Sequence, residues 1–181
     1  PNITILMDSY PSGTLSQFIQ EPKKYKINNT IKQIILIGIA RGMMHMHQNH
    51  CTIRCLQPDN IFLDEKLRPH ISIISSQILP TSEPSSLIYK APEVLTSSKA
   101  NEKADIYAFG IIMFEVITNS EPFPLFQSHQ ITENIFKRKI VYENYRPEFS
   151  TPIKKSLEDL IKQCLLKDPN ERPTADDLYH K

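Results

Sequence analysis

The segment from Asp105 to Ile117 is apolar around most of its helical circumference. A helix without a polar face has to be enclosed by other parts of the protein, because an exposed side would place apolar surface in water. The sequence therefore predicts a domain built around one buried helix. A chain of 181 residues is long enough for one medium-sized domain of this kind, or for a large piece of a bigger one.

A second, longer helix is predicted between Ile31 and Met46, where apolar residues recur at helical spacing. Asn29 or Thr30 is expected to cap it, because a short polar side chain can accept a hydrogen bond from the first free N–H groups. The methionines of this helix indicate core packing rather than a cofactor site. Its predicted buried face consists of Ile31, Ile34, Ile35, Gly38, Ile39, Gly42, Met43 and Met46.

Two helices are predicted near the C-terminal end. Pro152 is placed to start the first of them, and Thr174 followed by Asp177 has the spacing of a capping box for the second. The predicted buried face of the helix after Pro152 consists of Leu157, Leu160, Ile161, Cys164 and Leu165.

A small β-hairpin is predicted from two short apolar runs, Ile61–Leu63 and Ile71–Ile74, with a turn at Asp64–Pro69 between them. The segment Leu79–Ser86 reads as irregular and exposed, because it is rich in proline and hydroxyl residues. Together these patterns predict a mainly α domain, α+β overall, in which one β-hairpin accompanies the helices.

Charge and length exclude several classes of function. The net charge of +1 gives no reason to expect binding to nucleic acid or to a membrane surface. The basic run Lys137-Arg138-Lys139 is interpreted as a solvated helix face. The longest apolar stretch, Ile106–Phe114, has nine residues, well short of the ~20 that span a bilayer.

The cysteines and glycines exclude further sites. Cys51, Cys55 and Cys164 are an odd number without paired spacing, which predicts neither a disulfide framework nor a zinc site and favours a cytoplasmic setting. The four glycines are too far apart for a phosphate-binding loop. Because the chain starts at Pro1 and soon enters a strand-like segment, we expect it to be cut from a longer product.

Five segments, taken together, resemble the C-terminal lobe of protein kinases, closest in style to the tyrosine-kinase-like serine/threonine group. They correspond in order to the hinge, the HRDLKPxN loop, the APE motif, the D-[IV]-[YW]-x-F-G helix start and the DPxxRP motif. The matching residues are Asp8–Leu15, His47–Leu63, Ala91–Glu93, Asp105–Gly110 and Lys167–Thr174. The resemblance covers nearly the whole chain, so residues 1–181 are expected to be a C-lobe with the hinge, and the N-lobe is expected to be absent from them.

Three residues have structural roles that this resemblance implies. Glu93 of the APE motif is expected to form a buried ion pair with Arg172. Asp105 is expected to accept backbone N–H bonds from the HRD-like loop and also to cap its helix. Such contacts predict an intact fold and carry no prediction of activity.

The nucleotide site that the resemblance implies is reduced to its hinge and floor. Met7 is placed as the gatekeeper-like residue, Asp8 and Tyr10 offer backbone groups, and Phe62 lies at the position beneath the adenine base. These four residues are expected to be a remnant that cannot enclose ATP by itself. A longer parent chain is expected to bind nucleotide weakly and without metal.

The catalytic positions of the family are degenerate here. Cys55 stands at the position of the base, Gln57 at that of the phosphate-binding lysine, and Ile73 at that of the DFG aspartate, whereas Arg54 and Asn60 are retained. Isoleucine offers no oxygen to Mg²⁺, and one neutral asparagine is a weak ligand. We therefore expect no metal site and no cofactor, although ATP and Mg²⁺ serve the family.

Other catalytic arrangements remain open from the residues. Cys55 would need a depressed pKa and a basic partner to act as a thiolate, for which Arg54 adjoins it and His47 and His50 lie nearby in sequence. Asp59 or Asp64 would be the carboxylates available to replace the lost base. The packing positions of the family stay apolar, at Ile53 and Ile74.

The segment before the APE-like motif carries hydroxyl groups that a kinase could phosphorylate, and Arg54 is a candidate partner for the added charge. An exposed loop merely rich in hydroxyls explains the same composition. The candidate positions are Thr81, Ser82, Ser85 and Ser86.

The first hypothesis is a catalytically inactive pseudokinase that acts in signalling as a scaffold or allosteric partner. It implies protein partners, such as an active kinase, and neither nucleic acid nor membrane. The alternative is an active serine/threonine kinase that transfers phosphate from ATP at an unorthodox site. A degenerate gene copy without a cellular role is a third reading.

Overall fold

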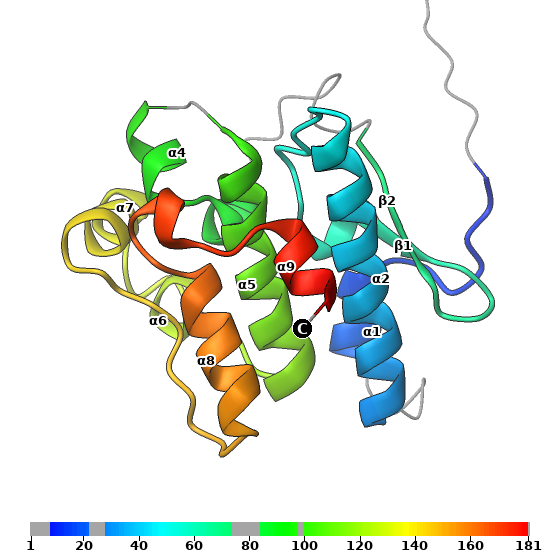
Figure 1. The fold of residues 1–181 in the computed structure, drawn as a ribbon. Coiled ribbons are helices and arrows are strands. Elements are labelled where there is room, and N and C mark those ends of the chain that lie inside the picture. The colour runs from blue at the N-terminus through cyan, green and yellow to red at the C-terminus, as the bar shows by residue number, and fades with distance from the viewer. Residues whose placement is uncertain (1–7, 22–27, 74–83, 98–99, 181) are drawn as a thin grey trace, which may run out of the picture.

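The structure is a computed structural model that describes residues 8–21, 28–73, 84–97 and 100–180. It is mainly helical with one two-stranded antiparallel sheet in these residues, as predicted (Figure 1). The elements are α1 (Leu15–Gln20), α2 (Asn29–Gln48), η1 (Pro58–Asn60), β1 (Ile61–Leu63), β2 (Pro69–Ile71), η2 (Pro84–Tyr89), α4 (Pro92–Ser97), α5 (Glu102–Thr118), α6 (Pro124–Gln127), α7 (Glu133–Tyr142), α8 (Lys155–Cys164), η3 (Pro169–Glu171) and α9 (Ala175–His180).

Helix α5 runs through the middle of the molecule, with α2 on one side and α8 on the other (Figure 1). Every residue of α5 from Ala104 to Val116 is buried, which confirms the prediction of a central apolar helix. Gly110 allows α8 to approach closely, because a Cβ at this position would lie 2.7 Å from the Cβ of Cys164. Helices α2 and α8, together with η2 and η3, pack against α5 and enclose its side chains.

Helix α2 is confirmed, but two details of its prediction were wrong. Asn28, rather than Asn29 or Thr30, is the N-cap, and its Oδ1 accepts a hydrogen bond from the backbone N–H of Ile31 at 2.9 Å. Ile34 is 45% exposed instead of buried. The buried stripe includes Ile35, which is about 100° further around the helix, so Ile34 is turned out of the core.

The hairpin is confirmed with a shifted second strand. The turn tightens at Asp64, whose Oδ1 accepts hydrogen bonds from the backbone N–H groups of Lys66 (2.8 Å) and Arg68 (2.9 Å). The chain therefore reverses early, and β2 spans Pro69–Ile71 instead of the predicted Ile71–Ile74. Ile71 pairs with Ile61, and Ile74 lies outside the described residues.

Helix boundaries differ from the predictions at two further places. The first helical hydrogen bonds of α8 go to the carbonyl of Lys154, so that this helix starts at Lys155 and not at Pro152. Helix α5 is capped by Asn101, whose Oδ1 accepts from the N–H of Ala104 at 3.2 Å. Asp105 therefore lies inside the helix, and the prediction that it caps α5 was wrong.

The final helix, α9, has the predicted capping box: Asp177 Oδ2 accepts from the N–H of Thr174 at 2.8 Å, and Thr174 Oγ1 accepts from the N–H of Asp177 at 3.1 Å. Residues 84–86, predicted to be irregular, belong to the 3₁₀ helix η2.

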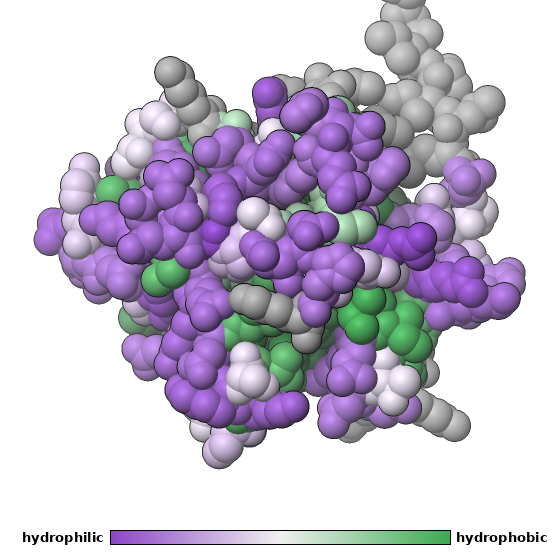
Figure 2. Space-filling view, viewed as in Figure 1, coloured by the Kyte–Doolittle hydropathy of each residue, from purple (hydrophilic) through white to green (hydrophobic). Residues whose placement is uncertain are grey.

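The face drawn in Figure 2 is mostly hydrophilic, with a hydrophobic area over α2. Ile34 and Ile37 of this helix are 45% and 55% exposed. None of the described helices has the length and apolar character needed to cross a membrane.

Candidate functional site

The carboxylate of Asp105 holds the loop from Ile53 to Asn60, here named the 53–60 loop. Its Oδ2 accepts a hydrogen bond from the N–H of Ile53 at 2.8 Å and its Oδ1 accepts from the N–H of Arg54 at 2.9 Å, as the resemblance implies. His47 Nε2 lies 3.0 Å from Oδ2. Asp105 is 2% exposed, so the start of the loop is fixed to the buried helix α5.

The end of the 53–60 loop is held by Asn60. Its Nδ2 donates to the carbonyl of Cys55 at 2.9 Å, and its backbone N–H donates to the carbonyl of Gln57 at 3.0 Å. The N–H of Ser72 donates to the Asn60 carbonyl at 2.8 Å, which brings Ile73 to the same region. The structure thus gathers the predicted degenerate positions around one loop.

The side chains gathered there do not suit a metal-bound nucleotide. Cys55 supplies a thiol, Gln57 and Asn60 supply neutral amides, and Ile73 is 40% exposed and aliphatic. Mg²⁺ requires hard oxygen ligands and is bound in proteins through carboxylates. Among the described residues no group of three or more histidine, cysteine, aspartate or glutamate side chains could hold a metal ion.

Of the two alternative carboxylates, Asp59 lies within the 53–60 loop and Asp64 lies outside it. Asp64 is engaged in the hairpin turn, where the backbone N–H of Arg68 is the main cause that lowers its pKa. Asp59 is exposed in η1 and lines the neighbouring groove. His47 is occupied with Asp105, and His50 is exposed.

Two of the four predicted adenine-site residues meet. The ring of Tyr10 stacks on that of Phe62 with centroids 5.3 Å apart, and it also lies 4.9 Å from the ring of His70. Asp8 is exposed, and Met7 lies outside the described residues. The ring of Phe62, expected to lie beneath the adenine base, is therefore in contact with the ring of Tyr10.

A bidentate ion pair joins α4 to the segment after η3. Arg172 Nη1 donates to Glu93 Oε1 at 2.7 Å, and Nη2 donates to Oε2 at 2.8 Å. The expected pair is therefore present, with the Arg172 side chain fully buried and that of Glu93 21% exposed. Three backbone carbonyls, of Leu166, Lys103 and Lys167, accept the remaining guanidinium hydrogen bonds.

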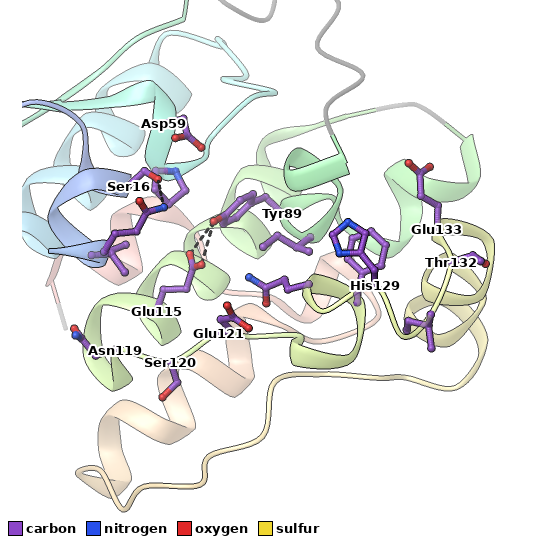
Figure 3. Close-up of a pocket in the computed structure, with 17 residues that line it drawn as sticks. Ser16, Asp59, Tyr89, Glu115, Asn119, Ser120, Glu121, His129, Thr132 and Glu133 are labelled. Carbon is purple, nitrogen blue, oxygen red and sulfur yellow. Dashed lines mark hydrogen bonds between the residues drawn. The ribbon is translucent and has the colours of Figure 1, made fainter. Parts of the chain in front are cut away.

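A groove of about 880 Å³ adjoins the 53–60 loop, and sequence reasoning missed it (Figure 3). Its wall contains Glu115, which is 8% exposed. The hydroxyl of Tyr89 lies 2.9 and 3.1 Å from the two Glu115 carboxyl oxygens. The one signal for this site was the glutamate at position 115, near the end of the apolar segment that forms α5.

Burial raises the pKa of Glu115 to about 8. The Tyr89 hydrogen bond lowers this pKa, whereas the nearby charges of Asp59 and Glu121 raise it further. Burial and the Glu115 charge also raise the pKa of Tyr89 well above its usual value. Burial therefore favours the protonated form of both Glu115 and Tyr89.

The candidate phosphorylation sites are not located by the structure. Thr81 and Ser82 lie outside the described residues, and only the backbone of Ser85 and Ser86, in η2, is described. Arg54, the candidate partner for an added phosphate, is exposed and has a left-handed backbone (φ 65°).

Comparisons with known proteins point in one direction. A sequence model of the protein kinase domain matches residues 1–181. A protein kinase and PP2C-like domain-containing protein of Arabidopsis thaliana is 30% identical over 98% of this chain and 32% of its own length. The dual specificity protein kinase zakA of Dictyostelium discoideum is 28% identical over 95% of this chain and 24% of its own length.

A third relative, the serine/threonine-protein kinase ULK3 of Xenopus laevis, is 26% identical over 94% of this chain and 37% of its own length. The chain thus spans between about a quarter and two fifths of these three relatives.

Proposed function

Because the chain belongs to the protein kinase family, we propose that it is a pseudokinase segment, which keeps the kinase fold to bind proteins and has lost phosphoryl transfer. The observation that carries the proposal is the chemistry of the 53–60 loop and its neighbour. The base, the phosphate-binding cation and the metal ligand are replaced together by Cys55, Gln57 and Ile73.

The replaced groups are those that phosphoryl transfer needs. The reaction depends on positioning and on cations that neutralise the charge developing on the transferred phosphate. A thiol, an amide and an alkyl group offer neither a carboxylate for the metal nor an ammonium for the phosphate. If only one of these groups were replaced, the other two would still be in place, but all three are replaced here.

The contacts that support the fold are retained in the same region. Asp105 still holds the backbone of Ile53 and Arg54, and Arg172 still pairs with Glu93. This combination supports a role as a scaffold or as an allosteric partner of another signalling protein, such as an active kinase. In this role the domain would work through its surface, in the cytoplasm.

The second candidate is an active serine/threonine kinase with an unorthodox site. Asn60 and Arg54 are retained, and the relatives named above carry kinase names. This reading requires an acceptor for the proton of the attacking hydroxyl, and Asp59 and Cys55 are the groups within the loop that have the chemistry for it.

Nucleotide binding by the full-length protein is expected not to depend on Mg²⁺. The measurement is a titration with a fluorescent ATP analogue, with and without Mg²⁺. The affinity should change by less than about threefold, because no carboxylate stands at the position of Ile73 to hold the ion. The Ile73→Asp variant, which supplies such a carboxylate, should gain Mg²⁺ dependence. If Mg²⁺ raises the affinity of the unaltered protein more than about tenfold, and Asn60→Ala abolishes this rise, the proposal is contradicted.

A further inference from the structure

The β-hairpin has a core face and an outer face. Ile61 and Leu63 of β1 are buried in the core, and Phe62 between them lies on the opposite face, because successive side chains of a strand alternate. Phe62 pairs with His70 of β2, so these two rings lie on the same side of the sheet. The outer face thus carries the aromatic ring that the resemblance places beneath an adenine base.

The ring of Tyr10 lies against this outer face. Its centroid is 5.3 Å from that of Phe62, with an angle of 26° between the ring planes, and 4.9 Å from that of His70, with an angle of 43°. Aromatic rings prefer offset arrangements at this spacing. A nucleic-acid base binds an aromatic side chain in the same way, by stacking its flat face on the ring. Tyr10 therefore makes the contact with Phe62 that a base would make.

A tight turn leads the chain away from Tyr10. The backbone N–H of Gly13 donates to the carbonyl of Tyr10 at 3.0 Å. Gly13 has a φ of 75°, a left-handed conformation that glycine adopts without strain. A Cβ at this position would also lie 2.1 Å from the Oε1 of Gln17. The turn at residues 10–13 is therefore specific to glycine, and it fixes the direction of the chain at Tyr10.

The same turn is bonded to the hairpin. The N–H of Leu63 donates to the carbonyl of Gly13 at 2.9 Å, and Thr14 forms an antiparallel bridge with Phe62. Thr14 is also the N-cap of α1, so the segment is fixed at a helix start as well. Figure 1 shows this segment running beside β1 and β2 before it enters α1. The backbone, and not the ring contact alone, therefore places Tyr10 over Phe62.

His70 holds the Tyr10 ring from the second strand. Its Nε2 lies 3.7 Å from the Oδ2 of Asp64, and Asp64 is itself fixed by the backbone N–H groups of Lys66 and Arg68. The imidazole is thus kept beside Tyr10 by the hairpin turn. Contacts from β1, from β2 and from its own turn act on the Tyr10 ring together.

We propose that Tyr10 occupies the adenine position of this domain from within, so that its ring covers Phe62 and competes with the base of any nucleoside or nucleotide. The ring has to leave Phe62 before a base can stack there. The affinity for the base is then lowered by the fraction of molecules in which Phe62 is uncovered. The inference rests on the proposed function, because a domain that transfers no phosphate can keep its base site covered.

The test uses the full-length protein and adenosine, which carries the base and neither phosphate nor metal. The changed positions of the 53–60 loop therefore do not enter the measurement. In isothermal titration calorimetry, Tyr10→Ala should bind adenosine at least about tenfold more tightly than the unaltered protein. Tyr10→Phe keeps the ring and should bind as weakly as the unaltered protein. Tyr142→Ala, which removes a tyrosine that is 76% exposed, is the matched control and should change nothing.

Two further variants locate the gain and guard against misfolding. Phe62→Ala added to Tyr10→Ala removes the ring on which the base would stack, and it should abolish most of the gain in affinity. Tyr10→Leu keeps apolar bulk at the turn and removes the flat ring, and it should still raise the affinity by at least about threefold. Urea unfolding shows that each variant is folded.

An unchanged affinity in both Tyr10→Ala and Tyr10→Leu would overturn the inference. So would a Tyr10→Phe variant that binds as tightly as Tyr10→Ala, or a gain that persists without Phe62. These outcomes are separable from failure of the proposed function. A protein in which Tyr10→Ala opens the base site and which also transfers phosphate contradicts only the proposed function. A protein in which neither is observed contradicts only this inference.

Discussion

Replacing Arg172 with alanine is expected to lower the free energy of unfolding by roughly 3–5 kcal/mol, because it leaves a carboxylate without its partner in a largely buried place. Arg172 is itself 2% exposed, and its guanidinium donates to both oxygens of Glu93. Its Cζ also lies 5.2 Å from the centre of the Tyr107 ring. The variant loses the ion pair, the bonds to three backbone carbonyls and this packing together.

Urea unfolding measures the effect, and two further variants separate its causes. Glu93→Gln keeps the arginine and its carbonyl contacts, so it should destabilise by less than Arg172→Ala. The double replacement Glu93→Leu with Arg172→Met removes both charges and should be less destabilising than the sum of the single changes. Lys137→Ala removes an exposed pair with Glu133 and should leave the stability nearly unchanged. A loss for Arg172→Ala no larger than that of Lys137→Ala would contradict the role given to this pair.

The second large effect is a fall in stability between about pH 4.5 and pH 8 that depends on Glu115. Burial raises the pKa of Glu115 in the folded protein to about 8, against an ordinary value of 4.5. The folded state therefore holds a proton that the unfolded chain has lost, and each unit of pH across this interval lowers the free energy of unfolding by up to about 1.4 kcal/mol. The full contribution is at most about 5 kcal/mol.

The measurement is urea unfolding from pH 5 to pH 9 of the unaltered protein and of Glu115→Gln. The glutamine cannot ionise, so the variant should match the unaltered protein near pH 5 and be more stable at pH 9. Glu121→Gln removes one of the charges that raise the pKa of Glu115. The fall in stability of this variant should therefore be slightly smaller. Glu65→Gln, remote from the groove, should follow the unaltered protein. Identical pH profiles for Glu115→Gln and the unaltered protein would refute the assignment.

The central helix and its surroundings were predictable because their signal is local. The apolar segment at Asp105–Ile117 allowed one burial pattern, and the structure buries α5 from Ala104 to Val116. The spacing of Thr174 and Asp177 likewise predicted the two hydrogen bonds that join them. At the start of α2 the predicted cap, Asn29 or Thr30, was wrong, because Asn28 carries the same side chain as Asn29 and can accept the same hydrogen bond, and the structure has the cap at Asn28.

The site was predictable in its residues and not in its shape. The loop positions Cys55, Gln57 and Asn60 followed from motif register, and the structure brings them together through the bond from Asn60 to the Cys55 carbonyl. The groove followed from no motif, since it forms where α1, η2, α5 and α6 meet. A glutamate inside the apolar part of a helix, such as Glu115, indicates an exceptional environment, but its partner, Tyr89, is 26 residues away and is identified only by the fold.

The central claim, that the fold is kept without its reaction, is tested most directly by phosphoryl transfer. Full-length protein is incubated with γ-labelled ATP and Mg²⁺, alone and with a general protein substrate, beside the Asn60→Ala variant. The account predicts that label on the chain and on the substrate stays at background and is the same for both proteins. Transfer above background that disappears with Asn60→Ala would show a working kinase site and contradict it.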